Sequence, residues 1–433
     1  MSSRYRKLLL FISGALAGHV LQDANGALSF AYETAYSGPP VSLSMPISPI
    51  TYPQRIIRPY LQGLLPDDPN VRADIANRYS CLGENPFDLL SHIGLDCPGA
   101  VQLVPEGDAS LVESRPGNLV ELSGPDLENR LRLLREHASS PWDANHEGRW
   151  SLGGAQSKMA LRYQGGHWYD CEGSEPTTHI LKPGVTGYDN QALDEYLCQR
   201  VALKMGLPAA KVEYLAFGSE HAVSIQRYDR IIGADGTVTR VHQEDLCQAL
   251  GVDPNRKYAE QGGPSSPDVL ALLATTEAEA AHNLQLFILY LLFNYLIGAT
   301  DAHAKNYSIL LSAGNSAVLA PLYDVASIAP YQSLSPRRRK PLRAAMSIGD
   351  ENRFGMLDNS HLEQLSHDAN LTAAGVTLEW INSSAIRMAS QMPTALQSAL
   401  DEANDAHLAG VEQVGPALAR EIGANCRRFL ERL

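Results

Sequence analysis

The spacing of hydrophobic positions changes along the chain and divides it into three parts. Up to about residue 110, short apolar strands alternate with helices that are bounded by segments rich in Pro and Gly. From Trp150 the pattern predicts short strands, interrupted by one helix at Asn190–Met205. From Glu244 onward it is mostly helical, with one hairpin at Tyr307–Leu322. The predicted strands of the middle part are Met159–Tyr163, His179–Lys182, Lys211–Ala216 and Ala222–Ile225. The helices predicted before it are Pro53–Gly63, Val71–Tyr79, Pro86–His92 and Leu127–Leu134.

The first residues of the chain fit two descriptions. Basic residues precede the apolar run Leu8–Ile12, and Ala15–Ala17 resembles the cleavage site of a signal peptide. Gly14 and Gly18 interrupt the apolar pattern, however, and Asp23–Gly26 supplies a hairpin turn before a further apolar run. We therefore expect a β-meander that opens a folded cytoplasmic domain.

Composition narrows the class of protein. The 433 residues carry 35 Lys and Arg against 48 Asp and Glu, a formal net charge of −13, which argues against broad affinity for nucleic acid or anionic lipid. The six cysteines form no C-x-x-C pair, so we expect reduced thiols. The most apolar stretch, Leu284–Ile297, is shorter than a membrane span. A globular cytoplasmic enzyme fits these features.

We predict an α+β protein with a β-rich N-terminal lobe and a helical C-terminal lobe. Its parts are a mixed β/α subdomain at residues 1–110, a β-rich lobe at 111–235 and a helical lobe at 236–433. This order of elements is the one that a two-lobed, protein-kinase-like fold requires, although architecture alone does not establish function.

A group of polar residues follows the most apolar predicted helix. Asp301 and Asn306 have the D-x-x-x-x-N spacing of kinase catalytic loops, in which a carboxylate faces the attacking hydroxyl and an amide oxygen binds Mg²⁺. Asp324, after the hairpin, adds a second carboxylate of the kind that Mg²⁺ prefers. The spacing also arises by chance, with Asp301 capping a turn. His303 and Lys305 then only orient the loop, although Lys305 could neutralise a transferring phosphoryl group.

Upstream segments supply candidates for nucleotide binding. Gly153–Lys158 is a small, Gly-rich turn before a predicted strand, where backbone N–H groups could contact phosphates, although the motif taken alone favours a plain hairpin turn. Lys182 lies at the end of an apolar strand, which is the position of the phosphate-binding lysine in a kinase-like lobe. An edge-strand lysine that extends its charged end into solvent would show the same pattern. Glu195 on the following helix is a candidate partner of Lys182, or a solvated acid.

Taken together, these motifs resemble the HipA-type serine/threonine kinase toxins of bacterial toxin–antitoxin modules. The resemblance runs nearly from end to end and includes Leu64–Asp67 and Asn85–Leu90 in the N-terminal part. The motifs that carry it are Ser151–Lys158, Thr178–Lys182, Gln226–Arg230, His242–Gln248, Lys257–Tyr258 with Gly262–Gly263, Ile297–Asn306, Tyr323–Asp324 and Ala345–Gly349.

The resemblance implies roles for individual residues. Asp301 would be the catalytic base, Asn306 and Asp324 the Mg²⁺ ligands, and Ser151 a serine that is autophosphorylated to silence the kinase. The residues implied to bind ATP are Gly153, Gly154, Ala155, Gln156, Ser157, Lys158, Lys182, His303, Lys305 and, through their backbones, Gln226 and Tyr228. The family commonly has Glu in place of Gln226 and Phe in place of Tyr228. Backbone recognition should survive both changes.

The resemblance also implies partners. We expect a HipB-like helix-turn-helix antitoxin, normally encoded beside the toxin and assembled with it on operator DNA, and a protein substrate such as an aminoacyl-tRNA synthetase. The basic segment Pro336–Arg343 is a candidate docking patch for such a substrate, or a solvated loop. Two alternatives stay open: a small-molecule phosphotransferase, and a catalytically silent co-repressor that is bound to the antitoxin.

Overall fold

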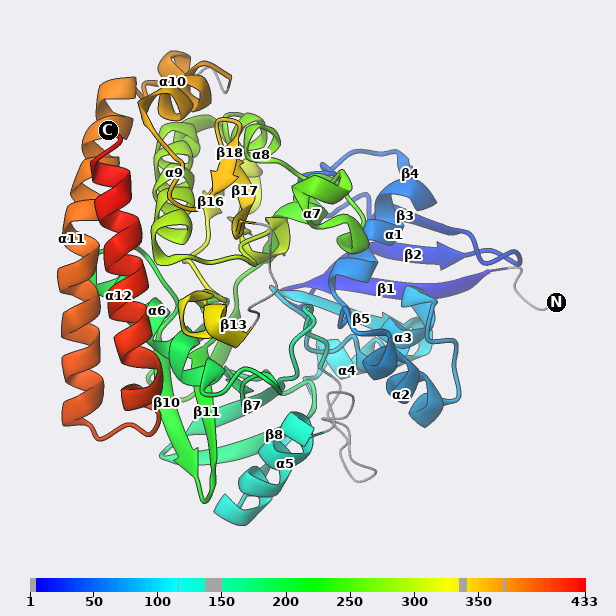
Figure 1. The fold of residues 1–433 in the computed structure, drawn as a ribbon. Coiled ribbons are helices and arrows are strands. Elements are labelled where there is room, and N and C mark those ends of the chain that lie inside the picture. The colour runs from blue at the N-terminus through cyan, green and yellow to red at the C-terminus, as the bar shows by residue number, and fades with distance from the viewer. Residues whose placement is uncertain (1–4, 116, 137–149, 335–340, 369–370) are drawn as a thin grey trace. The chain divides into compact units, whose positions relative to one another are not determined.

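A computed structural model describes residues 5–115, 117–136, 150–334, 341–368 and 371–433 (Figure 1). The chain separates into two compact units, each built from several segments. The first unit is Met1–Pro183, Leu215–Arg256 and Ile309–Ala317, and the second is Gly184–Tyr214, Lys257–Ser308 and Val318–Leu433. The predicted α+β class, with a sheet-rich N-terminal region and a helical C-terminal region, is confirmed.

The elements follow the predicted order closely. The first unit contains β1 (Arg6–Ile12), β2 (Ala15–Gln22), β3 (Leu28–Tyr32), β4 (Thr51–Pro53), α1 (Gln54–Gly63), α2 (Pro69–Tyr79), α3 (Pro86–Ile93), β5 (Val101–Pro105), α4 (Ser110–Glu113), β6 (Gly117–Leu122), α5 (Gly124–Glu136), β7 (Met159–Gln164), β8 (His167–Gly173), β9 (His179–Lys182), β11 (Glu220–Gln226), β12 (Arg230–Ile232), β13 (Val238–Arg240), β14 (Gln243–Asp245) and α7 (Leu246–Ala249). The second contains α6 (Gln191–Lys204), α8 (Ser266–Leu273), α9 (Ala280–Ile297), β17 (Arg343–Ile348), β18 (Glu351–Arg353), α10 (Asn359–Asp368), α11 (Leu378–Asp405) and α12 (Val411–Leu430). The unit boundaries pass through β10 (Val212–Phe217), β15 (Ser308–Leu311) and β16 (Ala317–Leu319).

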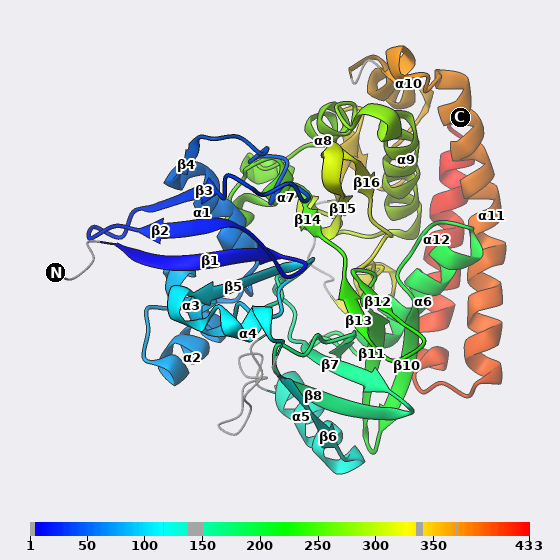
Figure 2. The same cartoon turned by 180° about the vertical axis from the view of Figure 1, so that it is seen from behind.

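The first unit opens with an antiparallel sheet in the order β4-β3-β2-β1-β5, which confirms the predicted meander (Figure 2). Both faces of β1 are buried, because alternate residues of a strand point to opposite sides. Leu8, Leu10 and Ile12 join a large core cluster, whereas Leu9 and Phe11 join a small cluster on the other face. The apolar run that resembles part of a signal peptide is therefore a central strand of this sheet.

The second sheet of the first unit runs in the order β11-β9-β7-β8-β6, with the last residues of β10 at its edge. Helix α5 packs on β11, and Arg130 on α5 donates to both carboxylate oxygens of Asp170 on β8, at 2.8 and 2.7 Å. Residues of both sheets belong to one hydrophobic cluster that extends from Leu8 to Ala222. The core of this unit is therefore continuous across residue 110.

The second unit is built around α9. Helices α8, α11 and α12 and strand β17 all contact it, and α11 and α12 lie side by side (Figure 1). Among the described helices, α9 has the length and composition to cross a membrane, but 72% of its apolar window is buried inside the protein. Core helices commonly show this pattern.

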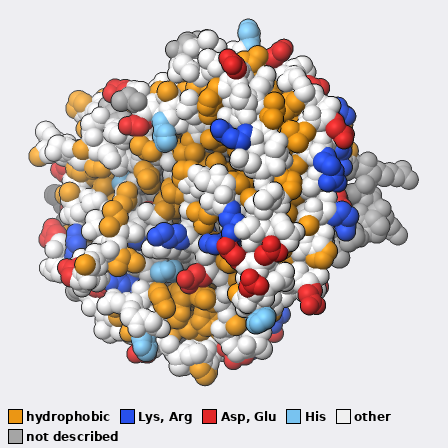
Figure 3. Space-filling model, turned by 90° about the vertical axis from the view of Figure 1, so that its left-hand side faces the viewer, with side chains coloured by type: hydrophobic (Ala, Val, Ile, Leu, Met, Phe, Trp, Pro, Cys, Tyr) orange, Lys and Arg blue, Asp and Glu red, His pale blue; other side chains and the backbone are white. Residues whose placement is uncertain are grey.

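On the face drawn in Figure 3, Lys and Arg side chains lie among Asp, Glu and hydrophobic ones, so the coloured residues there form no uniformly basic surface.

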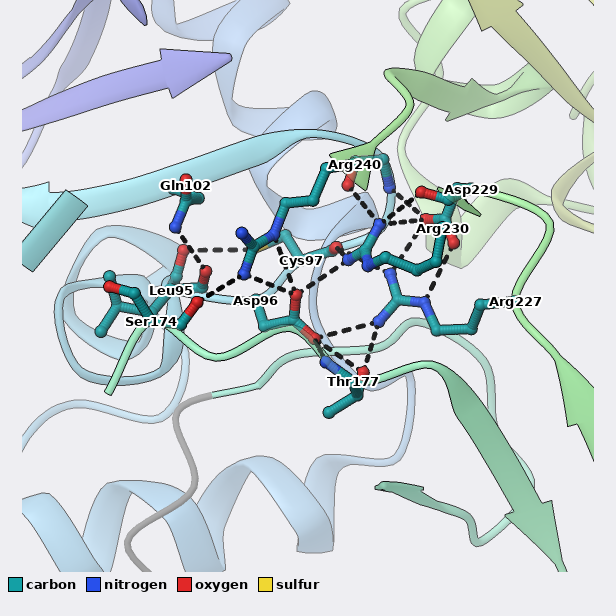
Figure 4. A network of polar contacts seen from close by, with 12 residues as sticks. Leu95, Asp96, Cys97, Gln102, Ser174, Thr177, Arg227, Asp229, Arg230 and Arg240 are labelled. Carbon is teal, nitrogen blue, oxygen red and sulfur yellow. Dashed lines mark hydrogen bonds and ion pairs between the residues drawn. The ribbon is translucent and has the colours of Figure 1, made fainter. Parts of the chain in front are cut away.

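A buried ionic network joins the segment after α3 to the segment after β11 (Figure 4). Asp96 accepts hydrogen bonds from Arg227 at 3.1 Å, Arg230 at 2.8 Å and Arg240 at 3.2 Å. Asp229 accepts two more from Arg227, at 3.0 and 2.9 Å. Burial alone would raise the pKa of Asp96, but the three guanidinium groups outweigh burial and hold that pKa well below its usual range. Both carboxylates are therefore ionised in the folded protein at neutral pH.

A further buried carboxyl group, that of Glu244, holds the segment after β3. Glu244 is fully buried and accepts a hydrogen bond from the Leu43 N–H at 2.7 Å. Asp245 and Gln248 form a capping box on α7, and Gln248 donates to the Tyr60 carbonyl at 2.9 Å. Burial raises the pKa of Glu244 to about 8, so it is largely protonated at neutral pH. The motif His242–Gln248 thus has a structural role within the first unit.

Removing the Asp96 carboxylate should strongly destabilise the fold. Asp96→Ala leaves three guanidinium groups with one carboxylate, Asp229, and loss of one partner of a buried ion pair costs about 3–5 kcal/mol. Urea unfolding followed by circular dichroism measures the change. Glu106→Gln, which breaks the exposed 3.0 Å pair with Lys7, is the control and should change stability by less than about 1 kcal/mol. An Asp96→Ala effect as small as that of the control would contradict the account.

Glu244 should make stability depend on pH. Because its pKa is about 8 in the folded state and about 4.3 in an unfolded chain, the folded state binds more protons between these values, and stability falls as pH rises through that window. In Glu244→Gln this contribution is absent, so the stability of the variant relative to the native chain should rise between pH 5 and pH 8. Urea unfolding at several pH values tests this. A difference that does not change with pH would rule out a protonated Glu244.

Candidate active site

Ser151 lies at the start of the Gly-rich loop and is buried. Its hydroxyl donates to the Leu64 carbonyl at 2.6 Å, and its backbone N–H donates to the Asp96 carbonyl at 3.0 Å. The side chain is therefore fixed against the N-terminal part of the first unit. In this conformation, with only 1% of the residue exposed, Ser151 is closed to a phosphoryl donor.

The rest of the loop, Gly153–Lys158, precedes β7. The Asp67 N–H donates to the Gly154 carbonyl at 3.1 Å, and Lys158 Nζ donates to the Gly153 carbonyl at 2.7 Å. Gly154 has a φ of +99°, a conformation that side chains other than that of Gly rarely adopt. The residue pattern thus produces the tight turn that the sequence predicts before a strand.

Lys182 and Gln226 lie on paired strands of the first unit. Lys182 ends β9 opposite Val223, and Gln226 ends β11 opposite His179, so the two residues are three positions apart along the strand pair, roughly 10 Å. Lys182 is buried, with 5% of the residue exposed. The Tyr228 hydroxyl donates to Gln243 Oε1 at 2.5 Å. Buried lysines are normally matched by anionic groups, so the position suits a phosphate-binding lysine.

The loop after α9 in the second unit is held by its own backbone. Gly298 caps α9 in the left-handed conformation at φ +80°. The Asp301 carbonyl accepts hydrogen bonds from the His303 N–H at 2.8 Å and from Asn306 Nδ2 at 2.8 Å. Because the amide nitrogen of Asn306 is used within the loop, its amide oxygen, which is the atom that Mg²⁺ prefers, points the other way.

Tyr323 joins the Asp324 segment to this loop. Its hydroxyl donates to the Lys305 carbonyl at 2.8 Å and lies 2.7 Å from Ser308 Oγ. Asp324 has a φ of +58°, a left-handed conformation that Asp tolerates better than most residues but that still costs energy. A backbone outlier held by its neighbours at this position is typical of functional sites.

His303 lies near both carboxylates of the site. Burial lowers its pKa to about 4, and the opposing effects of Asp301 and Asp324 do not restore it. At neutral pH His303 is therefore uncharged. An uncharged imidazole could contact a phosphate as a hydrogen-bond donor but could not neutralise its charge.

Helix α6 supports the segment that follows Asp324. The Asp194 carboxyl accepts a hydrogen bond from the Ser327 N–H at 3.0 Å, and the Ser327 hydroxyl donates to the Ile297 carbonyl at 2.6 Å. Burial raises the pKa of Asp194 well above its usual range. The neighbouring residue on α6, Glu195, is also buried, and its pairing with Lys182 stays a prediction.

The structure thus gathers the predicted residues into two groups, one in each unit. Asp301, His303, Lys305, Asn306 and Asp324 form a connected group in the second unit. Gly153–Lys158, Lys182, Gln226 and Tyr228 lie in the first. Of the basic segment, residues 336–340 lie outside the described part of the chain.

The donor set fits a sparse magnesium site. Within the described ranges, no group of three or more His, Cys, Asp or Glu side chains could hold a metal ion. Asn306 and Asp324 supply hard oxygen atoms, and Mg²⁺ is commonly held by one or two carboxylates with nucleotide phosphates completing its shell. A metal bound together with a nucleotide therefore suits these residues better than a metal held by protein alone.

Two tyrosines in the site were not assigned a role from the sequence. Tyr323 positions Asp324, as described above, and the Tyr258 hydroxyl donates a hydrogen bond to the Asp301 carboxylate. Both belong to motifs that the sequence singles out, Lys257–Tyr258 and Tyr323–Asp324. The only available signal was their place in those motifs, because contacts across such sequence distances leave no periodic pattern.

Comparisons with known proteins identify the family of the chain. The family model for the HipA-like C-terminal domain matches residues 150–400, and the model for the HipA N-terminal domain matches residues 8–104. The protein named "Putative kinase Y4mE" from Sinorhizobium fredii is 33% identical, over 93% of this chain and 94% of its own. The serine/threonine-protein kinase toxin HipA of Shewanella oneidensis is 28% identical, over 90% of this chain and 88% of its own.

A solved structure supports the same assignment at the level of the fold. The Shewanella oneidensis toxin–antitoxin complex of HipA, HipB and operator DNA contains a chain that matches with a TM-score of 0.79 at 24% identity, covering 98% of this chain and 97% of its own. Since the C-terminal family model alone spans more than half of the sequence, the chain belongs to the HipA family.

Proposed function

We propose that this protein is an ATP- and Mg²⁺-dependent serine/threonine kinase that acts as a growth-arresting toxin. The observation that carries the proposal is the connected group in the second unit. Hydrogen bonds to the Asp301 carbonyl fix Asp301 and Asn306 in one loop, and Tyr323 joins Asp324 to it. The relatives that cover most of the chain are named as kinases, one of them as a serine/threonine-protein kinase toxin.

In this proposal each residue has one chemical task. Asp301 orients the acceptor hydroxyl and takes its proton. The Asn306 amide oxygen and the Asp324 carboxylate hold Mg²⁺, which neutralises charge on the transferred phosphoryl group. Lys182 and the backbone of Gly153–Lys158 bind the phosphates. Catalysis by such a set is mainly positioning and charge neutralisation.

We also propose a position for the nucleotide base. The strand residues Lys182 and Gln226 are separated by roughly 10 Å along the β9–β11 pair, which is comparable to the span from the adenine to the phosphates of an extended ATP molecule. The backbones of Gln226 and Tyr228 would then contact the adenine while Lys182 contacts the phosphates. His303 and Lys305 are also proposed to contact ATP.

Ser151 is proposed as a site of autophosphorylation that silences the kinase. A phosphate there adds about −1.5 to −2 charges, which cannot remain in the buried position against the Leu64 carbonyl. Phosphorylation would therefore hold the Gly-rich loop away from the place where it contacts a nucleotide.

We propose two kinds of partner for this chain. A HipB-like antitoxin is suggested by the solved complex of a similar chain with HipB and operator DNA. We propose a translation-linked protein substrate, such as an aminoacyl-tRNA synthetase. A small-molecule phosphotransferase would use the same Asp–Asn–Asp set, and acceptor profiling distinguishes it from a protein kinase. A silent co-repressor would bind the antitoxin without any phosphoryl transfer.

Asp301→Asn should abolish transfer and spare nucleotide binding, whereas Asp324→Asn should impair both. Loss of a general base typically lowers the rate about 10²- to 10⁴-fold. Loss of a metal ligand should weaken Mg²⁺–ATP binding by about tenfold or more. ADP formation and fluorescent-nucleotide titration give the two quantities. Near-normal transfer by Asp301→Asn would show that the catalytic role is wrongly assigned.

Incubation with Mg²⁺–ATP should add one phosphate to Ser151, as intact mass and peptide mapping would show. The added phosphate should be absent from Ser151→Ala. This variant should continue to form ADP, because it lacks the serine whose phosphorylation is proposed to silence the kinase. Ser174→Ala is a matched control, since Ser174 is also a buried serine whose hydroxyl donates to a backbone carbonyl, that of Leu111. Phosphate that persists in Ser151→Ala would place the modification elsewhere.

A further inference from the structure

We propose that Tyr258 is a positioning residue that fixes the catalytic carboxylate of Asp301. This inference rests on the proposed kinase function and adds a residue to its machinery. The Tyr258 hydroxyl donates a hydrogen bond to Asp301 Oδ1, from a segment that lies 43 positions earlier in the chain.

Asp301 needs such a partner because its side chain is otherwise loosely held. Its backbone carbonyl is fixed by two hydrogen bonds, but 68% of its side chain is exposed. The Tyr258 hydroxyl donates a hydrogen bond to this exposed carboxylate. His303 Nε2 lies 3.9 Å from Asp301 Oδ1, which is too far for a hydrogen bond.

Tyr258 is itself held firmly. Its backbone carbonyl accepts hydrogen bonds from the N–H groups of Gln261 and Gly263, both at 3.0 Å, in a turn that Gly262 closes at φ +76°. Its ring packs edge-on against the buried His303 ring, with centroids 4.9 Å apart and planes at 82°. The hydroxyl is therefore presented from a fixed ring and not from a freely rotating side chain.

The bond has a direct consequence for catalysis. A hydroxyl on Oδ1 restricts rotation of the carboxylate and leaves Oδ2 to accept the proton of the substrate hydroxyl. Hydrogen bonds to a charged group are roughly twice as strong as neutral ones. Fixing one oxygen in this way raises the fraction of Asp301 side chains that are correctly placed before the acceptor arrives.

A competing interpretation is that the Tyr258 hydroxyl occupies the place of the acceptor hydroxyl and obstructs it. The two interpretations predict opposite signs, because removing an obstruction speeds transfer whereas removing a positioning bond slows it. One substitution, Tyr258→Phe, separates them. It keeps the ring against His303 and deletes only the hydroxyl.

The experiment compares the full-length native chain with Tyr258→Phe, Asp301→Asn and Tyr290→Phe. Tyr290 is the control for loss of a tyrosine hydroxyl, since its buried hydroxyl donates to the Pro208 carbonyl at 2.8 Å and not to a residue of the Asp301 group. Initial rates of ADP formation from Mg²⁺–ATP give kcat and KM, fluorescent-nucleotide titration gives Kd, and thermal unfolding gives Tm.

Tyr258→Phe should lower kcat about tenfold, the effect of losing one hydrogen bond to a charged group, with KM and Kd for Mg²⁺–ATP within twofold of native. Its Tm should match that of the native chain, whereas Tyr290→Phe should lower Tm and keep the native kcat. A Tyr258→Phe chain with native or higher kcat would overturn the inference. So would a Tyr258→Phe chain whose Kd and Tm worsen along with kcat, because the role would then be structural.

Failure of the inference is distinct from failure of the proposed function. If the native chain forms ADP and Asp301→Asn does not, the kinase assignment holds whatever Tyr258→Phe does. If neither the native chain nor Ser151→Ala, which lacks the silencing site, forms more ADP than Asp301→Asn, the proposed function fails, and the inference about Tyr258 fails with it.

Discussion

The buried carboxylate of Asp96 is the contact on which the organisation of the first unit depends. It receives hydrogen bonds from Arg227, Arg230 and Arg240, and through Thr177 it also reaches the segment before β9 (Figure 4). Arg227 lies between Gln226 and Tyr228 in the sequence, so the network fixes the backbone of the two residues that are proposed to contact adenine. Burying these charged groups costs desolvation energy, which the ion pairs offset only when every partner is in place. The network therefore specifies a single packing of these segments more than it adds to the net stability of the fold.

The same network connects the N-terminal subdomain with the nucleotide loop. Asp96 accepts the Ser151 N–H with its backbone carbonyl while its side chain holds the arginines. The Ser151 hydroxyl in turn contacts Leu64 near the end of α1. The N-terminal subdomain is thus a direct structural support of the Gly-rich loop, and not only an appended module.

Most elements could be predicted from the sequence because their hydrophobic patterns are strong. The strand His179–Lys182 and the helix before Gly206 lie almost where alternation and stop signals put them. Strand β6 was missed, because at the sheet edge most of its residues are exposed and show no alternation. The domain boundaries at residues 110 and 235 stay predictions, and the first unit crosses both.

The candidate site could also be predicted from the sequence only in part. The spacing of Asp301 and Asn306 and the Tyr323–Asp324 pair identified the catalytic loop, because such local motifs preserve the chemistry in sequence order. The left-handed backbone of Asp324 and the Tyr258–Asp301 bond could not be predicted, since they arise from tertiary packing. The Asp96 network could not be predicted either, because its members are spread over more than 140 positions of the sequence.

Hydrogen exchange with and without Mg²⁺–ATP tests the central claim most directly. If the ATP-binding and Mg²⁺-binding residues are assigned correctly, binding should slow amide exchange both in peptides that contain Gly153–Lys158 and in peptides that contain Asp301–Asn306. Peptides from the end of α11 should exchange at unchanged rates. Slower exchange in only one of the two loops, or in neither, would contradict the account.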